Sequence, residues 1–99
     1  MAKIRHSGSG SGCYVTTTAL GLTMTATTTE SSSTFTRTAN SVSVRTEGAN
    51  VWVAFDTTAT TADPSIFMRD GEELSVGDCS FSTIHAITEA GMATVRVVY

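Results

Sequence analysis

Hydrophobic and polar residues alternate with a period of two along much of this chain. In residues 41–46, Val42 and Val44 alternate with polar residues, and after a short turn Val51 and Val53 continue the two-residue spacing of β-branched residues in an apolar segment. Because successive side chains of a strand point to opposite faces, this period indicates half-buried β-strands. No stretch carries the apolar stripe of an amphipathic helix, which has a period of about 3.6 residues. The sequence therefore predicts an all-β protein.

Turn residues divide the chain into short strands. Asp70-Gly71 is the strongest hairpin signal, because tight hairpin turns favour these residue types. Turns and loops are predicted at residues 30–33, 47–50, 57–64, 70–71, 77–78 and 89–91. A spacing of about eight to twelve residues is typical of sandwiches and barrels. We therefore expect about seven to eight antiparallel strands in an antiparallel β-sandwich, of either the jelly-roll or the immunoglobulin-like type.

Trp52 has two interpretations. Val51, Val53 and Phe55 are expected to form one inward row, which places Trp52 on the opposite face. Trp52 then either packs against the second sheet or lies outside, where it would form an apolar surface for a partner. The core position is favoured for Trp52, because large aromatic residues are mostly buried. Tyr99 is open to the same two interpretations.

The N-terminal residues differ from the rest of the chain. Ser and Gly alternate in residues 7–12, and such a segment offers no side chains to bury. The sequence therefore predicts a flexible arm at residues 1–12, followed by a β-sandwich domain at residues 13–99. The arm is either an artificial linker or a natural tether that orders on a partner. The candidate partner contacts are Lys3, Ile4, Arg5, Trp52 and Tyr99.

Charge and hydropathy narrow the function classes. The 99 residues have a formal net charge of −3, 15% charged residues and a mean hydropathy of +0.08. The six basic residues are scattered, whereas nucleic-acid and anionic-membrane binding need clustered Lys and Arg. No apolar run approaches the roughly 20 residues of a membrane-spanning helix. We also expect no secretory signal, because Ser and Gly follow Lys3 and Arg5 where such a signal needs an apolar segment. We expect synthesis in the cytoplasm, with no nucleic-acid and no membrane partner.

Few residues offer catalytic or metal chemistry. His6 and His85 lack the local spacing of zinc ligands, so no metal or other cofactor is expected. Ser82 or Cys79 is the only nucleophile near His85 in the sequence, but Ser82 and His85 alternate to opposite faces of a regular strand. The aspartates fall in predicted turns, where their side chains commonly cap the backbone. We therefore expect no catalytic residues and no enzymatic activity.

Cys13 and Cys79 are the two cysteines. Without an export signal, two free thiols are the favoured interpretation. The alternative is a disulfide that joins the first strand to a late one, and the sequence does not decide between them.

Residues from about 41 to 99 resemble small virion proteins of tailed bacteriophages, of the head-decoration or cement type. The resemblance rests on the strand Val42-Ser43-Val44-Arg45, a turn at Gly48, the strand Val51-Trp52-Val53-Ala54-Phe55-Asp56, the loop at residues 57–64, Ile66-Phe67-Met68, the segment at residues 71–77 and the last strand at residues 93–97. Arg69-Asp70 departs from the small apolar pair that the family has before its glutamates. Residues 1–40 have no counterpart.

This resemblance implies a non-enzymatic structural protein that decorates or cements a capsid. Its partners would be the major capsid protein or other virion proteins, and its location would be the virion after synthesis in the host cytoplasm. A homotrimer is expected if the protein sits at a three-fold position of the capsid. The alternatives are a tail or head-fibre component, and a small carbohydrate-binding or protein-binding β-sandwich module.

Overall fold

The computed structural model describes residues 19–99, which form strands, turns and loops without a helix. The strands are β1 (Gly21–Ala26), β2 (Ser31–Glu47), β3 (Val51–Phe55), β4 (Ile66–Met68), β5 (Glu73–Ile87) and β6 (Ala93–Val98). Every strand pairing is antiparallel. The predicted all-β class with antiparallel strands is therefore confirmed.

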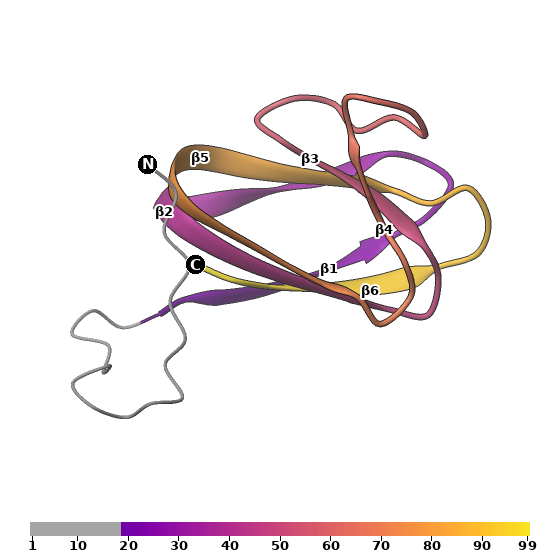
Figure 1. The fold of residues 1–99 in the computed structure, drawn as a ribbon, viewed down its shortest axis with the longest axis horizontal. Helices are drawn as coiled ribbons and strands as arrows, with labels where there is room; N and C mark the ends of the chain where they lie inside the picture. The colour runs from indigo at the N-terminus through magenta and orange to yellow at the C-terminus, as the bar shows by residue number, and fades with distance from the viewer. Residues whose placement is uncertain (1–18) are drawn as a thin grey trace.

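The six strands form one sheet, in the order β1-β6-β2-β5-β3-β4, which curls into a half-barrel (Figure 1). β2 and β5 have 17 and 15 residues and run through the centre of the sheet. Their pairing shifts register on both sides of Ala39, and Asp78 in β5 has a φ of 50°. Such bulges bend strands and increase their twist. The two long strands therefore carry the sheet around the core.

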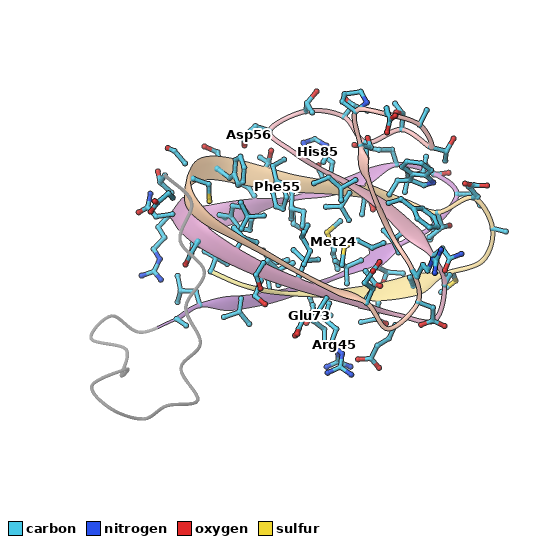
Figure 2. The ribbon with its side chains drawn as sticks, viewed as in Figure 1. Met24, Arg45, Phe55, Asp56, Glu73 and His85 are labelled. Carbon is cyan, nitrogen blue, oxygen red and sulfur yellow. The ribbon has the colours of Figure 1, made fainter. Side chains whose placement is uncertain are left out.

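The core lies inside the curl and consists mainly of aliphatic side chains. In β2, Val42 and Val44 are buried, and Val51 and Val53 of β3 form the predicted inward row. Figure 2 shows Met24 and Phe55 between the two sides of the curled sheet. Phe55 is only half-buried and stacks on Phe81 at a centroid distance of 4.4 Å, so it closes one end of the core.

Several predicted turns have a different structure. Ser31, Ser32 and Ser33 were expected in a loop, but they begin β2 and pair with residues 84–86 of β5. Gly77-Asp78 was expected to be a tight turn, but it lies within β5, where the left-handed backbone of Asp78 forms an irregularity in the strand. Predicted short strands consequently join into β2 and β5, and the predicted sandwich of seven to eight strands is not confirmed.

The Asp70-Gly71 turn forms without a hairpin. The backbone N–H of Glu72 donates to the carbonyl of Arg69 at 2.9 Å, as in a tight turn. The strands on either side do not pair, because β4 pairs with β3 and β5 pairs with β2 and β3. Asp70-Gly71 therefore correctly predicted a turn, but which strands β4 and β5 pair with depends on how the whole sheet curls.

Hydrogen bonds of one buried and several exposed polar groups hold the turns together at one end of the sheet. Thr46 is fully buried and its hydroxyl donates to the Arg69 carbonyl at 3.0 Å. The Asp70 carboxylate accepts the N–H of Gly48 at 2.8 Å, and the Asp70 N–H donates to the Asn50 side chain at 2.9 Å. The turn between β4 and β5 is therefore held against the turn between β2 and β3.

The last described residue is also the end of a paired segment. Leu20 and Tyr99 exchange two backbone hydrogen bonds of 2.7 and 2.8 Å, which extend the pairing of β1 with β6. Residues 19 and 20 therefore lie at the far end of β6 from the turn at residues 89–91.

Candidate functional site

A chain of four polar side chains lies on the outer face of β5. Thr83 and His85 are two residues apart in β5 and so share a face. His85 Nδ1 lies 2.6 Å from Glu30 Oε2, and its Nε2 lies 3.1 Å from the Thr83 hydroxyl. That hydroxyl lies 3.2 Å from Asp56 Oδ1. Figure 2 shows Asp56 and His85 close together on this side of the sheet. Two loops and one strand thus meet through these four side chains.

The two carboxylates of the cluster lie next to strand ends. Glu30 precedes β2 and Asp56 follows β3, and both strands are neighbours of β5. The Glu30 carboxylate also accepts the N–H of Ala59 at 3.1 Å, which ties the long loop after β3 to the loop before β2. His85 keeps 18% of its side-chain exposure and Glu30 keeps 26%. The cluster is therefore half-buried beneath that loop.

Asp56 is the most strongly held carboxylate of the cluster. Its Oδ1 accepts the backbone N–H groups of Ser82 and Thr83, both at 2.8 Å. These hydrogen bonds, to Ser82 first and then to Thr83, favour the charged carboxylate and lower the pKa of Asp56 below its ordinary value of 3.8. Asp56 has a φ of 59°, a left-handed conformation that aspartate tolerates better than most residues. The carboxylate therefore caps β5 from the end of β3.

The order carboxylate, imidazole, hydroxyl invites comparison with a hydrolytic triad. A triad also needs donors aimed at a developing oxyanion, often the backbone N–H of the nucleophile. Here the N–H of Thr83 is bound to Asp56, which also lies within hydrogen-bond distance of the Thr83 hydroxyl. The geometry thus fastens loops to β5.

This cluster was not predicted from the sequence. Ser82 and Cys79 were the candidate partners of His85, whereas the hydroxyl that contacts it is that of Thr83, on the same face of the strand. A hydroxyl two residues before a histidine in a predicted strand would have indicated that pair. Glu30 is 55 positions away from His85, and its contact depends on the pairing of β2 with β5.

Cys79 lies away from this chemistry. Its thiol donates to the Ala39 carbonyl at 3.3 Å, and burial raises the pKa of the thiol above its ordinary value. Cys79 is a free thiol in the described part of the chain. Cys13 lies outside the described residues, so the choice between two free thiols and a bridge stays a prediction.

A second surface feature is apolar. Trp52, Phe67 and Ile87 lie on the outer face of β3, β4 and β5, where the strand register places Trp52 between the other two. We call these three residues the aromatic patch. The Trp52 and Phe67 rings have centroids 5.0 Å apart and an interplanar angle of 56°. The core position favoured for Trp52 was therefore wrong, because the described strands form a single sheet and no second sheet among them covers the outer face of β3.

Beside the aromatic patch is an open hollow lined by Asn50, Phe67, Glu89 and Ala90. The Trp52 indole N–H donates to Glu89 Oε1 at 3.0 Å, which fixes the ring against the turn before β6. Phe67 is 40% exposed although it is a large apolar side chain. The hollow therefore combines an exposed ring, a carboxylate and an amide at one edge of the sheet.

Of the other predicted partner contacts, only Tyr99 lies within the described residues. Tyr99 is buried, packs on Phe35 at a centroid distance of 4.5 Å, and its hydroxyl accepts the N–H of Thr36 at 3.1 Å. Its side chain thus belongs to the core. Lys3, Ile4 and Arg5 lie outside the described residues.

Residues 19–99 contain neither a metal-binding cluster nor a membrane-spanning helix. No group of three or more His, Cys, Asp or Glu residues is arranged to hold a metal ion there. The same residues include no helix long and apolar enough to cross a membrane.

No family model, characterised protein or solved structure matches this chain. The resemblance to phage virion proteins therefore stays a prediction. The aromatic patch and its hollow are the candidate binding site, because they combine an exposed apolar ring with a carboxylate and an amide.

Proposed function

We propose that this chain is a non-enzymatic structural protein of a tailed-bacteriophage virion, where it decorates or cements the capsid. The observation that carries the proposal is the aromatic patch, in which the exposed Phe67 lies beside Trp52 at the edge of the sheet. Aromatic residues are enriched in the buried centres of protein interfaces. The hydrogen bond to Glu89 holds Trp52 in place before a partner binds, which reduces the entropy lost on binding.

The free edges of the sheet support the same proposal. Among residues 19–99, β1 and β4 are the two edge strands, and each has one side that pairs with no other described strand. A further strand from another subunit could add to either edge. In this proposal, the predicted sandwich of about seven to eight strands is completed on assembly, and its jelly-roll or immunoglobulin-like character belongs to the assembled particle.

The partners in this proposal are the major capsid protein and neighbouring copies of the chain. Small interfaces that repeat many times over a shell hold well through avidity. A homotrimer is the expected unit at a three-fold position, and the virion is the expected location. A cation-poor surface, with only four basic residues in positions 19–99, suits contacts with protein better than with nucleic acid.

The test is quantitative mass spectrometry of purified virus particles, which counts this chain against the main shell protein. We expect a near-stoichiometric count. A handful of copies would instead assign the chain to a tail or head fibre. Absence from particles would contradict a virion role. If the chain is absent from particles and its hollow binds soluble oligosaccharides, the results would favour a carbohydrate-binding module. Sites of that kind commonly combine aromatic rings with carboxylates and amides.

A further inference from the structure

The hollow contains a carboxylate with spare binding capacity. Glu89 Oε1 accepts the Trp52 indole N–H, and no basic side chain of residues 19–99 forms an ion pair with Glu89. The adjacent Phe67 ring is 40% exposed. A carboxylate beside an aromatic face is suited to a cationic side chain, which gains an ion pair and a cation–π contact together.

The chain itself carries a matching segment outside the described residues. Residues 1–18 include Lys3 and Arg5 but none of the nine acidic residues, all of which lie in positions 19–99. Lys3 and Arg5 flank Ile4, so an apolar side chain accompanies the two cations. This composition complements a hollow that offers an aromatic ring and a carboxylate.

Position along the molecule favours a second copy as the donor of this segment. The described chain starts beside Tyr99, at the far end of β6 from the turn that holds Glu89. Figure 1 shows these two places at opposite ends of the long axis, which measures 42 Å. Fifteen residues lie between Lys3 and Ala19, so the two residues are at most about 55 Å apart. Reaching its own hollow would use most of this span, whereas a head-to-tail neighbour places a hollow nearer to the segment.

We propose that Lys3-Ile4-Arg5 of one copy docks in the hollow of a neighbouring copy, with a cationic side chain over Phe67 and paired with Glu89. This inference rests on the proposed role of the aromatic patch in protein binding, and it names the partner. The contact is head-to-tail, so copies related by rotation close into a ring in which every hollow is filled.

Lys3 is the only lysine of the chain, which makes a zero-length cross-link informative. A carbodiimide joins an amine to a carboxylate in contact with it. We would mix isotopically light and heavy full-length protein, cross-link it and identify the joined peptides. The expected result is a Lys3–Glu89 link between light and heavy chains. A link only within single chains, or links spread over exposed carboxylates such as Glu73, would overturn the proposal.

Matched variants test the same contact by association in solution, measured by sedimentation. Glu89→Gln and Phe67→Ser are each expected to weaken self-association about tenfold. Glu73→Gln removes an exposed carboxylate elsewhere on β5, and Ile66→Ser removes a side chain of similar exposure, 38%, from the neighbouring position of β4. These two controls should associate like the wild type. A monomer at every concentration, or equal effects in variants and controls, would contradict the inference.

The two proposals fail separately. If the cross-link forms but the protein is absent from virus particles, the docking contact stands and the virion role falls. If the protein is abundant in particles but the cross-link never forms, the virion role stands and the occupant of the hollow is another protein.

Discussion

Single residues at strand ends hold the outer face of this protein together. Asp56 is one such residue, because its carboxylate accepts two backbone N–H groups of β5 while its backbone adopts a left-handed conformation. The carboxylate of Glu30 likewise accepts the backbone N–H of Ala59 and contacts the His85 ring. Neither belongs to a sequence motif, and each acts on residues more than twenty positions away.

Asp56→Asn should reveal this role through its pH dependence. Hydrogen bonds lower the pKa of Asp56 in the folded state, so the unfolded state binds the proton more readily. The carboxylate therefore contributes stability above its ordinary pKa of 3.8, and this is lost as the pH falls through the lower folded-state pKa. Thermal unfolding at pH 7 should show a less stable variant, and the difference should shrink below about pH 4.

Glu73→Gln is the control for this measurement, since Glu73 is exposed on the outer face of β5. It should unfold close to the wild type at pH 7. A difference between wild type and Asp56→Asn that is the same at pH 7 and pH 2 would show that the charge of Asp56 does not matter.

At the scale of elements, the period of two in the sequence predicted where strands lie. Turn residues predicted where strands end, and only some of those predictions were correct. β3 and the buried face of β6 were predicted correctly, because their valines recur at every second position, at Val51 and Val53 in β3 and at Val95 and Val97 in β6. β2 was divided in the prediction, since Ser31–Ser33 resemble a loop and only pairing with β5 makes them a strand. The division of β5 at Gly77-Asp78 has the same origin, because residues typical of turns also form bulges.

Two turn glycines offer a matched comparison. Gly48 has a φ of 110°, and a Cβ there would lie 2.9 Å from the backbone oxygen of Met92, whereas Gly71 has a φ of 84° and nothing within 4 Å. Gly71→Ala should cost about 1 kcal/mol from backbone strain alone. Gly48→Ala should cost about 2–3 kcal/mol, because the clash adds to the strain. Denaturant unfolding measures both, and equal losses would show that the Met92 backbone moves freely.

At the scale of the whole molecule, the sequence predicted the class but not the way the sheet closes. Trp52 shows why, because alternation placed it opposite Val51 and Val53 but could not say which face would be covered. The same limit applies to the site. Phe67 and Glu89 gave no signal, because their proximity depends on which turns meet at one end of the curl.

Hydrogen exchange should follow the order of strands in the sheet. β2 and β5 are central and paired on both sides, so their amides should exchange most slowly, with Val44 and Ile84 among the most protected. β4 is a short edge strand of 3 residues and should exchange fastest among the strands. Protection in β4 equal to that in β2 would show that this edge is covered, for instance by a second copy.

The backbone pair between Leu20 and Tyr99 also determines how the protein would respond to mechanical load. These residues lie side by side at the ends of two antiparallel strands. A pull that separates them loads that pair first and then each successive pair between β1 and β6. The sheet would therefore open like a zipper at low force, whereas tension along β2 and β5 would load many hydrogen bonds at once and meet much greater resistance.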